Sequence, residues 1–407
     1  IQAYEERVLQ KNMTFHLLPW VQVSGKGGIS ISETIRVTAD GCELLTDFER
    51  GIFVCWCWGI AMMKIIDDLS PIKTEVDYEL NGKQRAYLKV PHARNDSAWG
   101  SILIPITVIK NGNGPTVYLN GGMHGGEYEG PVCLTKLADE LQPEHIQGRV
   151  IIIPALNMPA VKTGTRLSPI DHKDMNRVFP GRLNGSISEI IAHYVYKVIL
   201  PRCDAVIDIH SGGYSLDLAP YISMHYLDNA TQRQDTFDAM KAFHAPYALI
   251  MNEFSGAGLL DYAVEDMGKI FLCAELGGGG RLSVYTLQIA ERGTRNILKH
   301  FGIIEGDPVP LTIPTRFLEI PEADNYHVAF SDGIYEPHHE PGDTVKANEI
   351  LGEIHFLDRI DREPERVNAN NNGTLIGIRA PGHVERGDSV GVIASAIDNL
   401  DAMLAGW

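Results

Sequence analysis

From residue 116 onward, short apolar runs alternate with longer segments of helical length, and this alternation leaves the chain few possible folds. Continuous apolar runs indicate strands that are buried on both faces, and helices between them indicate parallel crossover connections. The sequence therefore predicts an α/β fold with a mainly parallel sheet flanked by helices. The strand-like runs are 116–120, 150–154, 205–209, 247–251 and 270–274, and the helix-length segments are 130–141, 186–200, 232–243 and 283–301.

Three of these strand-like runs are followed, within four residues, by a residue that can bind a metal or carry a proton. His124 follows the first run, His210 follows the run 205–209, and Glu275 follows the run 270–274. Ligands of open α/β sheets gather at the carboxyl ends of the strands. One polar residue at a strand end is well explained by chance, but three together indicate a shared site.

The segment 120–130, NGGMHGGEYEG, sets His124 and Glu127 three residues apart in a glycine-rich stretch. An imidazole and a carboxylate can bind the same Zn²⁺ ion if the backbone turns tightly, and Gly125 and Gly126 permit such a turn. Taken alone, the motif fits an exposed glycine turn equally well, and a third ligand must come from elsewhere.

Composition excludes some classes of partner. The 407 residues carry a net charge of −17, so nucleic acid and anionic membranes are not expected to bind. The six cysteines form no evenly spaced framework, which favours a reducing, cytoplasmic setting.

Changes of pattern along the chain predict four segments: 1–54, an apolar junction at 55–63, a catalytic domain at 64–306 and a β-rich domain at 307–407. The apolar stretch 51–63 is shorter than the ~20 residues that a membrane span needs. After Pro310, short strands and glycine turns resemble small β-barrel modules of the biotinyl and lipoyl type. Carrier modules of this type need a lysine at a hairpin tip, and the turn 370–373 has none. We therefore expect a domain that covers the catalytic domain or mediates oligomerisation, so the chain could form homo-oligomers.

Residues from about 67 to the C-terminus resemble the succinylglutamate desuccinylase and aspartoacylase family, which are zinc-dependent relatives of the metallocarboxypeptidases. Four motifs carry the resemblance in the family's order. They contain His124 and Glu127 in GGMHGGE, Asn176 and Arg177 in DMNRVFPG, His210 in DIHSG, and Glu275 in AELG. The resemblance implies a zinc carboxypeptidase-like α/β fold.

The same resemblance implies roles for these residues. One Zn²⁺ per chain would be bound by His124, Glu127 and His210, with Glu275 as the general base. Asn176 and Arg177 would hold the substrate's α-carboxylate, because a guanidinium matches that group in shape and charge.

Two further residues near these motifs are harder to assign. Arg166, eleven residues before Arg177, could stabilise the oxyanion that forms when water attacks. Asp208, two residues before His210, is expected to point to the other face of its strand. The groups that orient the zinc-bound imidazoles are not identified by the sequence.

The implied substrate is a small N-acyl amino acid. One branch of the family removes acetyl from N2-acetyl-L-2,4-diaminobutanoate during ectoine degradation, and the segment 89–100, KVPHARNDSAWG, resembles the N-terminal signature of that branch. The alternatives are another N-acyl amino acid deacylase, of the succinylglutamate desuccinylase or aspartoacylase type, or a metallocarboxypeptidase. A non-catalytic zinc-binding protein is a third.

Residues 1–54 resemble the C-terminal end of the proteins of a different family, the pita-bread metallopeptidases, which include prolidase and ectoine hydrolase. Glu33 matches the last metal-binding glutamate of that family, and GCELLT at 41–46 matches the strand that follows. The family's other ligands are absent, so Glu33 alone cannot form a dinuclear site. A natural fusion, a read-through product or a fragmentary gene model would each explain such a remnant, and we expect the downstream activity not to need it.

Overall fold

The computed structural model describes residues 11–17, 20–23, 27–30, 33–40, 42–45, 70–251 and 257–405. The chain divides into two compact units, Ile1–Ala61 and Met62–Trp407. The apolar stretch 51–63, which we interpreted as a junction, lies outside the described residues.

The described residues of the first unit form short antiparallel strands. β4 (Glu33–Val37) pairs with β1 (Thr14–Leu17) on one side and with β5 (Cys42–Leu44) on the other. β2 (Trp20–Val23) and β3 (Gly27–Ser30) form a separate hairpin. Glu33 begins β4, opposite Leu17.

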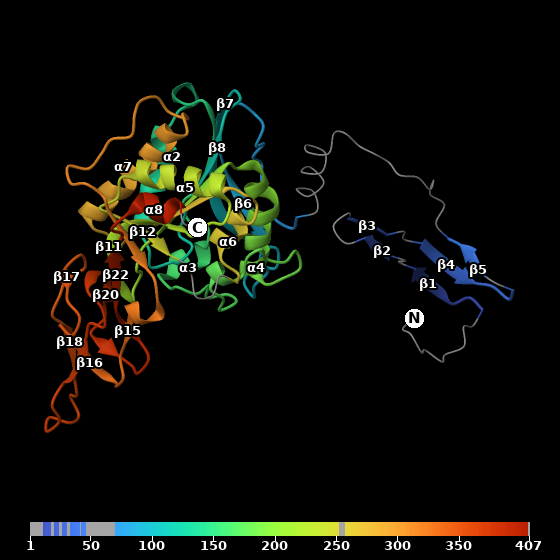
Figure 1. The fold of residues 1–407 in the computed structure, drawn as a ribbon. Helices are drawn as coiled ribbons and strands as arrows, with labels where there is room; N and C mark the ends of the chain where they lie inside the picture. Colours follow the sequence, from blue (N-terminus) through green and yellow to red (C-terminus); the bar gives the residue numbers. More distant parts are fainter. Residues whose placement is uncertain are drawn as a thin grey trace. The chain divides into compact units, whose positions relative to one another are not determined.

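The second unit is built on one 13-stranded sheet (Figure 1). Its strand order is β17-β20-β22-β14-β12-β11-β13-β10-β8-β9-β7-β6, and β15 pairs with β22 outside this path. The strands are β6 (Gly82–Pro91), β7 (Ser101–Asn111), β8 (Thr116–Gly121), β9 (Gly148–Ile153), β10 (Ala205–His210), β11 (Leu216–His225), β12 (Tyr247–Met251), β13 (Ile270–Gly278), β14 (Arg316–Ile320), β15 (Tyr326–Val328), β17 (Thr344–Val345), β20 (Gly373–Arg379) and β22 (Ser389–Ala396).

Parallel pairing is confined to the centre of this sheet. β9, β8, β10 and β13 are parallel to one another, whereas β11 runs against β13 but parallel to β12, which in turn is parallel to β14. β6, β7 and the C-terminal strands pair antiparallel. The sheet is therefore mixed. Short connections such as the one from β6 to β7 join antiparallel neighbours, and the alternation of strands and helices in the sequence does not indicate these pairs.

Helices cover both faces of the sheet. Alternate strand residues face opposite sides, so Val117 and Leu119 pack in a core with α2, α5 and α7, while Tyr118 packs in a second core with α4 and α6. The helices are α2 (Glu129–Glu140), α3 (Met158–Thr163), α4 (Ile187–Tyr194), α5 (Ala230–Phe243), α6 (Leu260–Glu265), α7 (Val284–His300) and α8 (Leu400–Ala405). Across the described part of the chain, we find no helix with the length and hydropathy of a membrane span.

The C-terminal strands both extend the central sheet and form a smaller one. β14, β20 and β22 are hydrogen-bonded into the large sheet, and β20 also pairs with β11, where Leu216 lies opposite Arg379. A four-stranded sheet shares a small hydrophobic core with β17, β20 and β22 of the large sheet. Its strands are β19 (Glu365–Asn368), β18 (Ile350–His355), β16 (Gly333–Pro337) and β21 (His383–Val384). Residues after 307 are therefore β-rich and continuous with the sheet that carries the candidate site.

Candidate functional site

The loop after β8 places His124 and Glu127 side by side. Its close packing explains the glycines: a Cβ added at Gly125 would lie 1.9 Å from the carbonyl oxygen of Ala160. The Gly125 amide also donates to the carbonyl of Thr165 at 2.9 Å. As a result His124 Nδ1 lies 2.7 Å from Glu127 Oε1, and both side chains are buried.

β10 and β13 supply the next two groups from neighbouring positions. His210 is the last residue of β10 and lies opposite Glu275 of the parallel strand β13. His210 Nδ1 is 2.9 Å from Glu127 Oε2, so the carboxylate of Glu127 lies between two imidazoles. One potential ligand atom from each of His124, Glu127 and His210 lies within 4.8 Å of the others.

Each of these imidazoles is held from behind by a second carboxylate. His124 Nε2 lies 3.0 Å from Asp174 Oδ1, and His210 Nε2 lies 2.9 Å from Asp208 Oδ2. The expectation that Asp208 points away from His210 is wrong, because residues two apart on a strand share a face. Asp174, in the predicted motif around Arg177, went unrecognised because its partner His124 is fifty residues away in the sequence.

This donor set fits a divalent transition metal. Two imidazoles and one carboxylate, with their other nitrogens held by carboxylates, match the ligands and the outer hydrogen bonds of catalytic zinc sites. Although burial opposes the charged form, the two adjacent imidazoles lower the pKa of Glu127, which keeps this group an anion. The residues present therefore fit the metal that the sequence predicts.

Glu275 is a partly buried carboxylate beside this cluster. Its Oε2 atom has no hydrogen-bond partner among the described residues. Burial raises the pKa of Glu275 to about 7; His210 opposes this shift and repulsion by Glu127 adds to it. A carboxylate with such a pKa can both take and release a proton near neutral pH, as a general base and acid must.

The three remaining predicted residues lie around the same cavity. Arg166 donates from Nε to Asp174 Oδ2 at 3.0 Å, so the carboxylate that holds His124 also holds this guanidinium. Asn176 and Arg177 belong to a 3₁₀ turn, Met175–Arg177. The Oδ1 atom of Asn176 accepts the backbone amide of Leu260 at 3.0 Å, and Arg177 is exposed at the mouth of the cavity.

All seven predicted site residues line one cavity of about 470 Å³. Its lining also includes Tyr221, His225 and Asp261, which belong to none of the four sequence motifs. His225 ends β11, a strand without a recognised motif, and Asp261 lies in the first turn of the short helix α6. Only the packing of these elements places them beside the predicted site.

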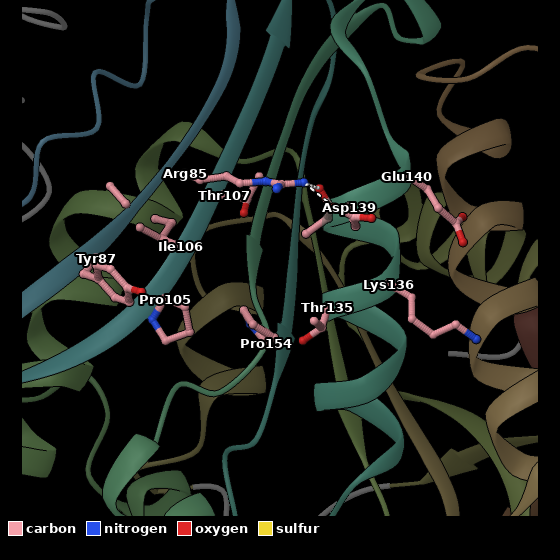
Figure 2. Close-up of a pocket in the computed structure, with 12 residues that line it drawn as sticks. Arg85, Tyr87, Pro105, Ile106, Thr107, Thr135, Lys136, Asp139, Glu140 and Pro154 are labelled. Atoms are coloured by element: carbon pink, nitrogen blue, oxygen red, sulfur yellow. Dashed lines mark hydrogen bonds and ion pairs between the residues drawn. The ribbon is translucent and has the colours of Figure 1, made fainter.

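A second hollow, of about 680 Å³, lies between strands β6 and β7 and helix α2 (Figure 2). Figure 2 shows Arg85 directed at Asp139, whose Oδ1 atom is 2.9 Å from Arg85 Nη2. Its other charged residues, Lys136 and Glu140, pair with Glu291 and Arg295. The lining contains no imidazole and no thiol. Although larger, this hollow carries no catalytic set, so we assign the chemistry to the cavity around Glu275.

Comparison with known proteins identifies the fold and its relatives. Residues 113–301 match the succinylglutamate desuccinylase/aspartoacylase catalytic domain. The chain is 42% identical over 331 residues to the N-alpha-acetyl-L-2,4-diaminobutyric acid deacetylase of Halomonas elongata, a match that covers 81% of this chain and 97% of that protein. A separate, short match to the ectoine hydrolase of the same organism is 44% identical over 56 residues and covers 13% of each protein.

A solved structure agrees with this relationship. The product-bound ectoine utilization protein EutE (DoeB) of Ruegeria pomeroyi superposes with a TM-score of 0.78 at 42% identity, covering 80% of this chain and 99% of that one. Identity at this level over nearly the whole relative is found between members of one family. The chain therefore belongs to the succinylglutamate desuccinylase/aspartoacylase family.

Proposed function

We propose that this chain is a deacetylase that hydrolyses the amide bond of N-α-acetyl-L-2,4-diaminobutyrate, releasing acetate and the free diamino acid in the degradation of ectoine. The observation that carries the proposal is the 42% identity to the Halomonas deacetylase across 97% of that protein. The similarity to an ectoine utilization protein supports the same substrate.

The proposal assigns one Zn²⁺ to the cluster of His124, Glu127 and His210. When bound there, zinc would lower the pKa of a water molecule to ~7 and polarise the acyl carbonyl of the substrate. Asp174 and Asp208 would keep the two imidazoles oriented, each accepting the Nε2 proton so that Nδ1 stays free to bind.

Glu275 would act as the proton carrier of the reaction. Its Oε2 atom would take a proton from the attacking water and then pass it to the nitrogen of the departing amine. The raised pKa of this carboxyl group and the unpartnered oxygen support this role.

The arginines would bind the substrate's negative charges. Arg166, fixed by Asp174 next to His124, would stabilise the oxyanion that forms when the carbonyl carbon is attacked. Arg177 would hold the α-carboxylate, with the amide Nδ2 of Asn176 as a second donor. All three line the cavity that contains Glu275.

A cytoplasmic location is part of the proposal. The cysteines that the structure describes, Cys42, Cys133, Cys203 and Cys273, are free thiols, which suits a reducing compartment. The predicted homo-oligomer can be tested by light scattering of the purified chain.

Acetate release from a panel of substrates tests the function. The panel contains N-α-acetyl- and N-γ-acetyl-diaminobutyrate, N-acetylaspartate and N-succinylglutamate, the last followed by release of succinate. We expect the zinc-loaded chain to prefer the N-α-acetyl compound by kcat/KM. A preference for N-acetylaspartate or N-succinylglutamate would refute the substrate, and hydrolysis of none would refute the enzyme.

Two variants separate metal binding from proton transfer. Glu275→Gln should lower kcat by about 10²–10⁴-fold and retain zinc, since this group acts on water. His210→Ala should abolish zinc binding, because this variant removes a proposed ligand. Metal analysis of both purified proteins checks these roles, and equal loss of zinc in the two variants would contradict them.

A further inference from the structure

The cavity is elongated along two neighbouring strands. Its floor contains alternate residues of β13, namely Phe271, Cys273 and Glu275, and alternate residues of β11, including Tyr221 and His225. The strands are antiparallel, and Tyr221 lies opposite Glu275. Four residues of strand, at ~3.4 Å each, separate Glu275 from Phe271. The cavity therefore extends roughly 13 Å away from the metal cluster, toward His225.

Asp261 lies at this far end. It is only 8% exposed and lines the cavity from the first turn of α6. Its Oδ1 atom accepts the amide of Tyr262 at 2.7 Å, and its Oδ2 atom is 3.7 Å from His225 Nε2. The other nitrogen of His225 is fixed by Glu265 Oε2 at 2.8 Å. A carboxylate offers about four acceptor positions, and Asp261 presents this group to the cavity.

Charge distinguishes Asp261 from the other cavity residues. Among the described residues that line the cavity, the carboxylates are Glu127, Glu275 and Asp261. The first two are assigned to the metal and to the attacking water. Asp261 is thus the carboxylate left to interact with the part of the substrate that does not react.

We propose that Asp261 binds the side-chain ammonium group of the substrate and so makes the enzyme selective for N-acyl diamino acids with a cationic side chain. This inference rests on the proposed function, because it takes the substrate's chemistry from there. A buried ammonium group requires a carboxylate partner, since its desolvation is otherwise too costly. The same carboxylate repels N-acetylaspartate and N-succinylglutamate, which carry an anion instead of a cation on the side chain.

The dimensions agree with this placement. Five bonds separate the acyl carbon of N-α-acetyl-2,4-diaminobutyrate from its side-chain nitrogen, a reach of roughly 6 Å when extended. Contacts of about 3 Å at each end bring the total close to the length of the cavity.

The groups proposed to hold the two charged ends of the substrate are joined by short backbone contacts. The amide of Leu260, next to Asp261, donates to Asn176 Oδ1 at 3.0 Å. The carbonyl of Gly258 accepts the amide of Phe179 at 2.9 Å, and a Cβ added at Gly258 would lie 2.3 Å from the carbonyl oxygen of Arg177. The segment with the α-carboxylate donors therefore fixes α6, and the spacing of the two binding groups is set by the fold.

Asp261→Asn tests the proposal against a neutral substrate of the same shape. N-acetylnorvaline replaces the ammonium group by a methyl group and keeps the rest of the substrate. We expect kcat/KM for N-α-acetyl-diaminobutyrate to fall by about 10- to 100-fold, as for the loss of one charge-assisted hydrogen bond, and that for N-acetylnorvaline to stay equal or rise. Asp261→Glu, which keeps the charge, should retain most of the preference.

Controls make the outcome decisive. Asp266→Asn removes an exposed carboxylate next to the same helix and should leave kcat/KM unchanged for both substrates. Zinc content and melting temperature of each variant establish that the site is intact. If Asp261→Asn lowers kcat/KM equally for both substrates, or for neither, Asp261 does not bind the ammonium group. If the unmodified chain prefers N-acetylaspartate, the proposed function itself fails.

Discussion

Asp208→Asn should weaken metal binding although it changes only one atom outside the proposed ligand set. Four buried groups form a chain of hydrogen bonds with a fixed direction. The hydroxyl of Tyr118 donates to Asn120 Oδ1 at 2.8 Å, Asn120 Nδ2 donates to Asp208 Oδ1 at 2.7 Å, and Asp208 Oδ2 accepts from His210 Nε2 at 2.9 Å. The carboxylate accepts at both ends, which an amide cannot do.

The substitution leaves two unfavourable arrangements. If the new amide turns its NH₂ toward His210, the imidazole must carry its proton on Nδ1, the atom that faces Glu127 and the proposed metal. If it turns NH₂ toward Asn120, two donors face each other in a fully buried position, which costs ~1–3 kcal/mol. Loss of such an orienting group typically lowers metal affinity about 10- to 100-fold. The expected change in binding free energy is thus about 1.4–2.7 kcal/mol.

A double variant identifies the cause. Tyr118→Phe removes the hydroxyl that fixes the orientation of Asn120, so in Tyr118→Phe/Asp208→Asn the amide of Asn120 can rotate and accept. The new amide can then present its oxygen to His210, and part of the zinc affinity should return. Zinc dissociation constants from competition with a fluorescent chelator measure this, with Tyr118→Phe alone as the control. Unchanged affinity in Asp208→Asn, or no recovery in the double variant, would refute the argument.

Three further predictions concern the loop, a helix and the N-terminal unit. Gly125→Ala should reduce both zinc content and stability, by about 1–3 kcal/mol in urea unfolding, because its Cβ would collide with the carbonyl of Ala160. Hydrogen bonds from the Ser186 amide and neighbouring basic side chains lower the pKa of Glu189 from 4.5 to about 2, so this group stabilises the fold above pH 4.5 and the gain is lost as pH falls toward 2. Glu189→Gln should therefore lower the free energy of unfolding by about 1 kcal/mol at pH 7, and the difference from the unmodified chain should vanish in acid. Deletion of residues 1–61, a separate compact unit, should leave kcat/KM for N-α-acetyl-diaminobutyrate unchanged, and a folded but inactive truncation would contradict this.

The strands predicted from the sequence are those with continuous apolar runs. The run 247–251 coincides with β12, and the other four differ from β8, β9, β10 and β13 mainly at their ends. β11 was not predicted, because its ten residues mix polar and apolar positions instead of forming one apolar run. The antiparallel flanks and the C-terminal extension of the sheet depend on pairing between distant segments, which local pattern does not encode.

The candidate site shows the same division. His124, Glu127, His210 and Glu275 could be predicted as candidates because each follows an apolar run within a recognisable motif, and the fold brings them together. Groups that act through a second residue were missed or misassigned: Asp174 and Asp208 stabilise imidazoles, Glu265 fixes His225, and Asp261 faces the cavity from a six-residue helix. Their importance depends on which partner the fold brings near, so no spacing in the sequence reports it.

The pairing of β20 with β11 has a consequence for how the protein is made. The proposed metal ligands and the proton carrier all precede residue 276, whereas Ile376 of β20 and Val392 of β22 help to close the cavity. During synthesis the polar residues of the site thus emerge well before the apolar side chains that cover them. A nascent chain stalled near residue 370 would hold every proposed ligand and still leave the cavity open to water, so we expect hydrolysis to begin only after the last strands have added to the sheet.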